Sequence, residues 1–254
     1  MIQVFKNREL ALQIALTDFK LRYENSALGF IWALLEPLCM MVIMWFVFAR
    51  VVRIKIPNYQ LFLLIGLLMW NFFSRGTVQG IRAFTARLGI LSKIYFPRSV
   101  IIFASCLTNL FFFCMEMVIF LAMMLIFHVP MGWHMLLLIP LFLLEFLLIY
   151  SISLFLAPLN LKYGDFGNLW GVLVRVGFYM TPILYSISFI SDKMRFYYLL
   201  NPMARMISAV RAVIFPEIFL DDDYFWILPA TVAVIFVAGE ILFKRLEPRF
   251  GDYI

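Results

Sequence analysis

The chain has 254 residues, of which 65% are hydrophobic and only 14% charged, and its mean hydropathy is +0.96. A soluble domain of this size cannot hide so much apolar surface, because its outside must still be wetted. Composition therefore excludes an ordinary soluble enzyme and predicts an all-α integral membrane protein. The net charge of +6 comes from cations between the hydrophobic runs, and we expect no nucleic-acid partner.

Six hydrophobic stretches are long enough to cross a bilayer as helices, which requires about 20 apolar residues each. Charged clusters delimit these stretches at 25–49, 56–74, 99–127, 135–161, 166–191 and 224–243. We expect a single transmembrane domain over 1–254. It would comprise a surface helix (1–24), spans one to five (25–191), an external region (192–223), and span six with a tail (224–254).

Lysine and arginine positions predict the orientation, because these residues accumulate in cytoplasmic loops. If both termini are cytosolic, thirteen of these cations lie in inside segments and seven in outside segments, with Arg175 within a span. The cluster at 50–55 argues mildly against this arrangement. The balance still favours two cytosolic termini, which would place the turn at 161–168 in the cytosol.

The N-terminal segment 5–22 is expected to form a helix that lies along the membrane. At 100° per residue it carries two apolar stripes on opposite sides, one able to meet lipid and the other a neighbouring helix. The first stripe comprises Phe5, Leu12, Leu16 and Phe19, and the second comprises Leu10, Ile14 and Leu21.

The segment 75–98 is the most basic part of the chain, and Arg82, Arg87 and Lys93 lie within it. Gly76, Gly80 and Gly89 make a continuous helix doubtful, because glycine is a poor helix former. A basic cytosolic face at a membrane can contact anionic lipid or dock a partner protein. Both interpretations remain open.

The outer region 182–223 has apolar pieces that are each too short to span the membrane. Asn201 before Pro202 is a good helix start, because asparagine caps and proline suits the first helical position. Short apolar helices can re-enter a bilayer only where protein or a water-filled cavity satisfies their ends. We therefore expect two short re-entrant helices before the last span.

Charged residues inside the predicted spans point to function or to buried pairs, because an isolated charge there is costly. Glu240 is explained by Lys244 four residues later. Arg175 lies mid-span, one helical turn from Tyr179. It could pair with Glu116 or Glu145, or it could line a hydrated path.

Catalytic and metal chemistry find little support in this sequence. The two histidines, His128 and His134, share one short loop without acidic or cysteine neighbours, so no metal site is predicted. A GxxxxGK[ST] phosphate loop is also missing from the sequence. If the protein uses ATP, we expect another chain to hydrolyse it.

Several motifs occur in the order typical of one transporter family. They are RYENSALGFIWALLEPL (22–38), GLLMWNFFSRG (66–76), KIYFPRS (93–99), LKYGDFGN (161–168), TPILYS (181–186) and NPMARMISAVR (201–211). Together they resemble type-2 ABC export permeases, and most closely the branch that exports polysaccharides and polyol phosphates such as O-antigen, capsule and teichoic acid. Each motif is weak by itself, but the ordered set covers the whole chain.

The resemblance implies a non-enzymatic permease subunit of a bacterial cytoplasmic membrane. Two copies would enclose a channel for a lipid-linked polymer, and two ATP-binding subunits would hold ATP and Mg. The turn at 161–168 would be a short coupling helix on the ATPase, and 82–93 would belong to a cytosolic gate. The expected coupling residues are Lys162, Tyr163, Asp165 and Phe166, and the expected path residues are Trp32, Trp70, Arg175 and Tyr179.

Three alternatives remain open on sequence grounds. The chain could export another lipid or a drug, or it could be an ion-coupled carrier in which Arg175, Glu116 and Glu145 form a relay. It could also be a membrane-embedded transferase that acts on lipid-linked sugars. Dependence on ATP hydrolysis separates the exporters from the carrier, and product formation without an ATPase would favour the transferase.

Overall fold

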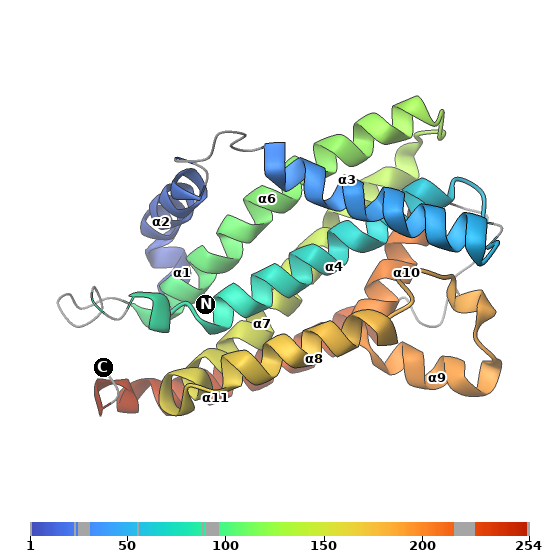
Figure 1. Ribbon diagram of the computed structural model, residues 1–254. Coiled ribbons are helices and arrows are strands. Elements are labelled where there is room, and N and C mark those ends of the chain that lie inside the picture. Colours follow the sequence, from blue (N-terminus) through green and yellow to red (C-terminus); the bar gives the residue numbers. More distant parts are fainter. Residues whose placement is uncertain are drawn as a thin grey trace.

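A computed structural model of the chain describes residues 2–22, 24, 31–54, 56–87, 89, 97–215 and 227–252, and within these ranges it contains no strand (Figure 1). The expected all-α fold is confirmed. The helices are α1 (Ile2–Lys6), α2 (Arg8–Leu21), α3 (Ile31–Trp45), α4 (Tyr59–Ile81), α6 (Arg98–Ile126), α7 (Leu138–Tyr163), α8 (Phe166–Met180), α9 (Asp192–Leu200), α10 (Pro202–Ile214) and α11 (Ile227–Leu246). A π-helical turn, Phe46–Val51, extends α3, and 3₁₀ turns occur at Thr85–Arg87, Trp133–Leu137, Ile187–Phe189 and Glu247–Asp252.

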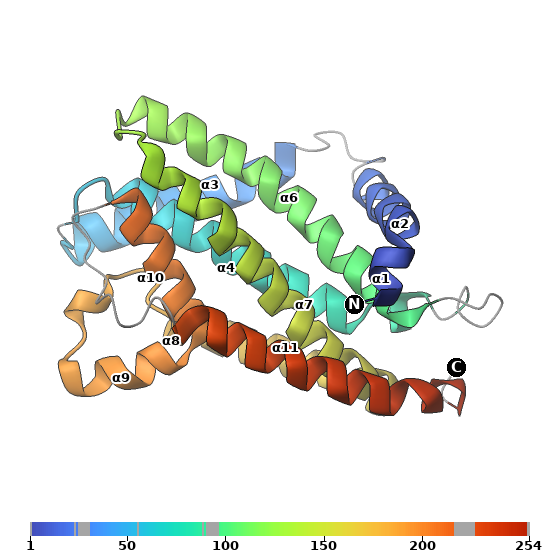
Figure 2. The same cartoon turned by 180° about the vertical axis from the view of Figure 1, so that it is seen from behind.

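Five helical stretches in the described part are long and apolar enough to cross a membrane. They are Leu34–Val51, Tyr59–Ile81, Arg98–Ile126, Trp133–Tyr163 and Ile227–Leu246, and they correspond to predicted spans one to four and six. Helix α4 lies at the centre of the body, because 78% of an apolar 18-residue stretch within it is buried, against 11% of the first span. Seen from behind in Figure 2, α6 and α7 lie over α4, and α11 lies along α7.

Helix α4 continues to Ile81, well beyond the predicted boundary at residue 74. Two of the three glycines that made continuity doubtful, Gly76 and Gly80, are contact points for α7. A Cβ on Gly76 would lie 2.8 Å from Cγ2 of Ile149, and one on Gly80 would lie 2.2 Å from Oγ of Ser153. Close packing of two helices therefore outweighs the low helix propensity of glycine at these positions.

The predicted span at 166–191 is not one continuous helix. Helix α8 has 15 residues and ends at Met180, which gives it a length of about 22 Å where a bilayer core is about 30 Å thick. The chain then runs as an irregular segment over 181–186, most of which is buried. Two short helices, α9 and α10, follow in the region expected to hold them.

Side chains from α4 and α10 satisfy the buried carbonyls of this irregular segment. Arg211 of α10 donates to the carbonyl oxygens of Pro182 and Ile183, both at 2.6 Å, and Tyr59 donates to that of Leu184 at 2.5 Å. Irregular backbone can remain buried only where such partners replace water. The guanidinium stays charged, because arginine is not deprotonated in proteins.

Helix α10 begins as the sequence predicts. The side-chain oxygen of Asn201 accepts from the backbone N–H of Met203 at 3.0 Å, and Pro202 occupies the first helical position. The Asn201 amide also donates to the hydroxyl of Thr181 at 2.9 Å. The cap thus starts α10 and joins it to the end of α8.

The long helices run between two ends of the body, as Figure 1 shows. The chain termini, the 3₁₀ turn at 85–87 and the α7–α8 turn all lie at one end, which we call the terminal end. The link from α3 to α4, the loop at 127–137 and helix α9 lie at the other, the opposite end. Segments predicted to share a side of the membrane therefore do share one end of the molecule.

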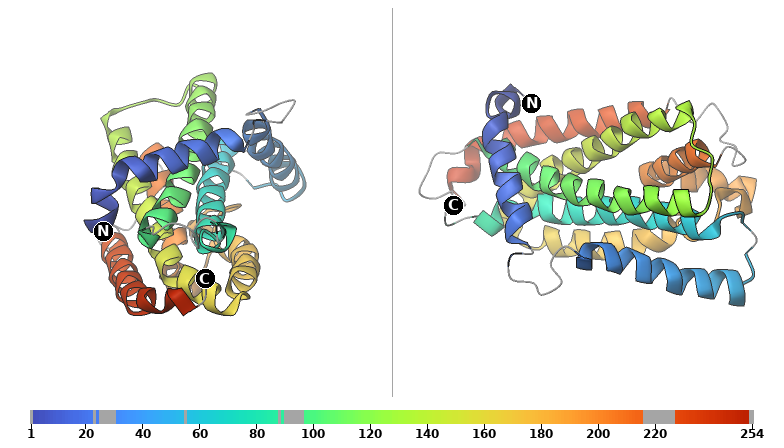
Figure 3. Two further views of the ribbon diagram at one scale, coloured as in Figure 1. Left: turned by 90° about the vertical axis from the view of Figure 1, so that its left-hand side faces the viewer. Right: turned by 90° about the horizontal axis from the view of Figure 1, so that it is seen from above.

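Helix α2 crosses the body near the terminal end, transverse to the long helices (Figure 3). Ala11 and Ala15 are buried there, and Ala11 belongs to a small cluster against which Ile14 packs. On the other side Leu12 is 44% and Leu16 41% exposed. The two-sided pattern holds with a correction: Phe19 faces the protein, 4.7 Å from the ring of Phe112, whereas Leu21 is exposed.

Candidate functional site

The turn between α7 and α8 presents a compact set of charged and aromatic side chains at the terminal end. Helix α7 ends at Tyr163, Gly164 has a φ of +72°, and α8 begins at Phe166. The positive φ explains the glycine, which adopts this conformation without a steric penalty. Helices α7 and α8 meet directly at one bend here, whereas the family resemblance implied a separate short helix.

The four expected coupling residues all lie at this bend. Lys162, Tyr163 and Asp165 are exposed and Phe166 is half-buried. The Lys162 ammonium lies 4.7 Å from the centre of the Tyr163 ring, and that ring lies 5.8 Å from the ring of Phe166. The turn is therefore a small protruding surface with one anion, one cation and two contacting aromatic rings.

Two polar side chains hold this turn rigidly against the end of α4. Asn160 accepts from the backbone N–H of Gly167 at 2.7 Å and donates to the carbonyl of Ile81 at 3.4 Å. Arg82 donates to the side-chain oxygen of Asn168 at 2.9 Å. A Cβ on Gly167 would lie 3.1 Å from Nε of Arg82, so the glycine leaves room for the arginine. Motion of the turn would be passed to α4.

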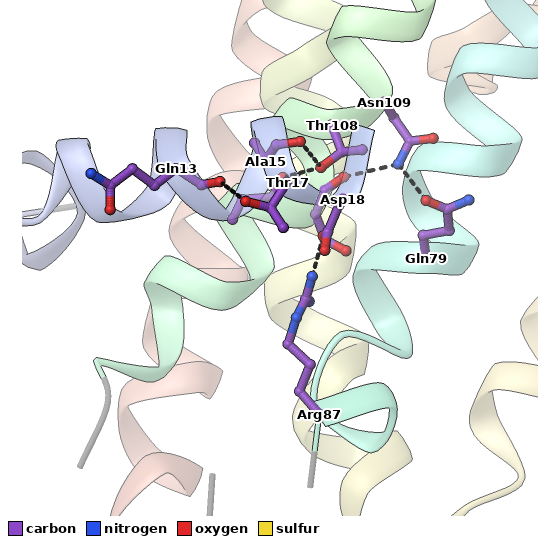
Figure 4. Close-up of polar contacts among 10 residues, drawn as sticks. Gln13, Ala15, Thr17, Asp18, Gln79, Arg87, Thr108 and Asn109 are labelled. Atoms are coloured by element: carbon purple, nitrogen blue, oxygen red, sulfur yellow. Dashed lines mark hydrogen bonds and ion pairs between the residues drawn. The ribbon is translucent and has the colours of Figure 1, made fainter. Parts of the chain in front are cut away.

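A second arginine connects the end of α4 to the N-terminal helix. Arg87 forms an ion pair with Asp18 of α2, and Figure 4 shows their side chains pointing toward one another. On the adjoining face of α2, the carbonyl of Ala15 lies 3.4 Å from the Thr108 hydroxyl of α6, which also donates to the carbonyl of Ala104 at 2.9 Å. Arg82 and Arg87, both expected in a gate region, thus join the α7–α8 turn and α2 to α4. Lys93, the third, lies outside the described residues.

The C-terminal turn supports the same region from its other side. The rings of Phe84 and Phe250 lie 5.4 Å apart, and Phe250 also lies 5.8 Å from Phe243 of α11. Arg98 lies over Phe250, at 5.1 Å, and donates to the carbonyl of Glu247. Burial raises the pKa of the Glu247 carboxyl, although the Arg98 cation opposes the shift.

A cleft of about 690 Å³ opens between α2, α4 and α6 at the terminal end. Its charged lining comprises three arginines and one aspartate, and its uncharged polar lining comes from α4 and α6. The lining residues used below are Asp18, Arg22, Gln79, Arg82, Arg87 and Thr108. Positive charge therefore predominates in the cleft.

The comparison with known proteins agrees with this architecture. A family model described as ABC-2 type transporter matches residues 10–215. The chain belongs to the ABC-2 type transporter family. It is 30% identical over 247 residues to an O-antigen export system permease protein RfbA of Klebsiella pneumoniae, covering 97% of this chain and 95% of that protein. The protein of the same name in Myxococcus xanthus is 27% identical over 254 residues, covering 99% and 98%.

The expected path residues of this ABC-2 chain do not gather in one pocket. Trp32 on α3 is 55% exposed and Tyr179 on α8 is 72% exposed, and Arg175 is exposed as well. Trp70 is buried instead: its ring contacts α8, 3.1 Å from the Cβ position of Gly177 and 6.1 Å from the ring of Phe178. Figures 1 and 3 show α3 and α8 flanking α4 on one face of the body.

The two buried acids of this transporter, Glu116 and Glu145, do not form the ion pair with Arg175 that was considered for them. Glu116 is buried and forms an ion pair with Arg75 of α4. Glu145 is buried too, and neither of its oxygens has a hydrogen-bond partner in the described part of the structure. Because Arg175 is exposed on α8, it is placed to meet whatever covers that face.

Sequence reasoning missed three residues that organise these regions. They are Asp18, Asn160 and Arg211, none of which the sequence analysis singled out. Each forms a hydrogen bond with a partner that is distant in the sequence. Asp18 accepts from Arg87, which is 69 residues away. Asn160 donates to the carbonyl of Ile81, 79 residues away, and Arg211 donates to the carbonyl of Phe62, 149 residues away. Arg211 is the last residue of one quoted family motif, and Asn160 directly precedes another. These positions are the signal in the sequence that could have indicated their importance.

Proposed function

We propose that this chain is the permease subunit of an ATP-driven exporter that moves a lipid-linked polysaccharide or polyol-phosphate polymer across the bacterial cytoplasmic membrane. The observation that supports this proposal most directly is that the chain is similar, over nearly its entire length, to permeases named for O-antigen export. Because the chain has no phosphate loop, ATP and Mg would be bound by two separate ATP-binding subunits.

In this proposal the terminal end faces the cytosol, and both chain termini are cytosolic. The chain then crosses the membrane six times, with α8 and the irregular segment 181–186 together making the fifth crossing. The satisfied carbonyls of 182–184 support this, since unsatisfied backbone cannot remain in a bilayer. Helices α9 and α10 would be the re-entrant pair on the external side.

A second copy of the chain would cover the face formed by α3 and α8. Helix α8 exposes Leu169, Val172 and Val176 beside Arg175 and Tyr179. An apolar face that also carries a cation and an aromatic ring suits a channel wall better than plain lipid contact. Arg175 would meet hydroxyl or phosphate groups of the polymer, and Tyr179 and Trp32 would stack on sugar rings. Trp70 would support α8 from behind.

The coupling role is tested by replacing the protruding side chains of the α7–α8 turn. The double variant Asp165→Ala/Phe166→Ala should lose ATPase association and polymer export while it still inserts and folds. Met131→Ala/His134→Ala alters two exposed residues at the opposite end and serves as the matched control. Co-purification in mild detergent and polymer export in cells are the measurements. Full partner binding and export by the double variant would remove the docking role.

Orientation is tested with single cysteines in a background lacking Cys39, Cys106 and Cys114. A cysteine at Gly132 should react with an impermeant thiol reagent from outside the cell, and one at Lys162 should not. The opposite labelling pattern would invert the proposed topology.

An ion-coupled carrier remains the second candidate, because the buried carboxyl of Glu145 has no hydrogen-bond partner in the described residues. Export by reconstituted permease with its ATPase distinguishes the two. ATP-dependent export supports the exporter, and export driven by an ion gradient without ATP supports the carrier.

A further inference from the structure

The cleft between α2, α4 and α6 has the charge and chemistry of an anion site. Among the residues that the structure describes, Arg22, Arg82 and Arg87 line it together with one acid, Asp18. Guanidinium groups form two parallel hydrogen bonds with phosphate, which makes arginine the usual residue for phosphate recognition. The Gln79 amide and the Thr108 hydroxyl add uncharged polar groups to the same wall.

The position of the cleft indicates what kind of molecule carries the anion. Helix α2 forms one wall, and its outward side exposes Leu12 and Leu16. A transverse helix with such an apolar side lies in the plane of the membrane surface. The cleft is therefore at the depth of lipid headgroups, where a phosphate attached to an apolar chain would reach it.

Two of the arginines also connect the cleft to its surroundings. Arg87 forms an ion pair with Asp18 of α2. Arg82 donates to Asn168 at the start of α8. An anion in the cleft would compete with Asp18 for Arg87 and would pull on Arg82, which contacts the α7–α8 turn.

We propose that this cleft binds the phosphate group of a lipid at the cytosolic membrane surface, and that Asp18 competes with that phosphate for Arg87. The inference rests on the proposed function for its sidedness and for the supply of a lipid-linked substrate. Two lipids share the required chemistry: the phosphate-bearing carrier of the polymer and the anionic phospholipid of the bilayer.

The test uses two substitutions that break the same ion pair. Arg87→Gln removes a cationic contact for phosphate and should weaken binding by roughly tenfold, the size of one charge-assisted hydrogen bond. Asp18→Asn removes the competitor and should strengthen binding by a few-fold. A purely structural ion pair would make both variants change affinity in the same direction. Lys193→Gln, an exposed cation at the opposite end, should bind as the parent does.

Binding is measured by calorimetric titration of the full chain in uncharged detergent, with farnesyl pyrophosphate, a short-chain phosphatidylglycerol and neutral farnesol as probes. Preferential binding of farnesyl pyrophosphate assigns the cleft to the carrier of the polymer, and equal binding of both anions assigns it to bilayer phospholipid. Either result supports the phosphate site if the two variants shift affinity in opposite directions.

Equal binding of farnesol and farnesyl pyrophosphate would overturn the proposal, as would affinities that Arg87→Gln and Asp18→Asn leave unchanged or shift together. The experiment needs neither ATP nor transport. If export fails in its own assay while the two variants still shift affinity in opposite directions, the result counts against the proposed exporter and not against the phosphate site in the cleft.

Discussion

Arg211 offers the sharpest test of how this fold is held together, because it is a buried cation that secures an irregular segment inside the body. Its side chain is 2% exposed and donates to the carbonyls of Pro182 and Ile183, and to that of Phe62 at 2.9 Å. The guanidinium carbon also lies 3.5 Å from the centre of the Phe62 ring. Replacing Arg211 with alanine removes all of these contacts.

The magnitude follows from the carbonyls that lose their donor. Pro182 and Ile183 belong to no helix, and each buried unsatisfied carbonyl costs about 1–3 kcal/mol. The gross loss is thus about 2–6 kcal/mol. Part is recovered because a buried cation no longer has to be desolvated, so we expect a net destabilisation of about 2–4 kcal/mol. For a chain of this size that lowers Tm by roughly 5–15 °C.

The assay is thermal unfolding of the detergent-solubilised protein, followed by intrinsic fluorescence and by the loss of the monodisperse peak in size-exclusion chromatography. Arg175→Ala is the matched control, because it removes an exposed arginine from a neighbouring helix and should change stability by less than about 0.5 kcal/mol. Arg211→Lys should not rescue, since an ammonium cannot span two carbonyls as a guanidinium fork does.

A substitution on α4 tests the contacts of Arg211 independently. A Cβ on Gly66 would lie 2.4 Å from Nη2 of Arg211, whereas one on Gly171 would have no heavy atom of the described residues within 4 Å. Gly66→Ala should therefore lower Tm, and Gly171→Ala should leave it unchanged or raise it slightly. If the Arg211→Ala variant has the same Tm as the parent protein, this account of how the buried segment is stabilised would be refuted.

Four substitutions test other parts of the structure. Gly80→Ala should disturb packing of α4 on α7, because its Cβ would lie 2.2 Å from Oγ of Ser153; thermal unfolding should show a loss of about 1–3 kcal/mol typical of overpacking. Phe250→Ala should cost about 3–5 kcal/mol, as for other buried phenylalanines, and release of the C-terminal turn should appear as faster proteolysis there. Arg175→Ala and Tyr179→Ala should slow polymer export in cells without changing Tm; a large loss of stability would place these side chains in the core rather than on the path.

Local patterns in the sequence determined the class of this protein and most of its elements. Apolar length alone placed five of the six predicted spans, because a bilayer imposes the same length on every crossing helix. The Asn201-Pro202 start of α10 and the exposed charged turn after α7 were also predictable, since caps and turns depend on neighbouring residues. The family followed from ordered motifs distributed between residues 22 and 211.

The tertiary structure decided what depended on partners far apart in the sequence. Residues 181–186 are apolar enough to suggest a continuing helix, yet Tyr59 and Arg211 satisfy their carbonyls and allow them to leave it. Glu116 pairs with Arg75, 41 residues away, and so leaves Arg175 on the outer face. Hydropathy records how apolar each residue is, but burial and pairing depend on which helices pack together, and only the folded chain determines that.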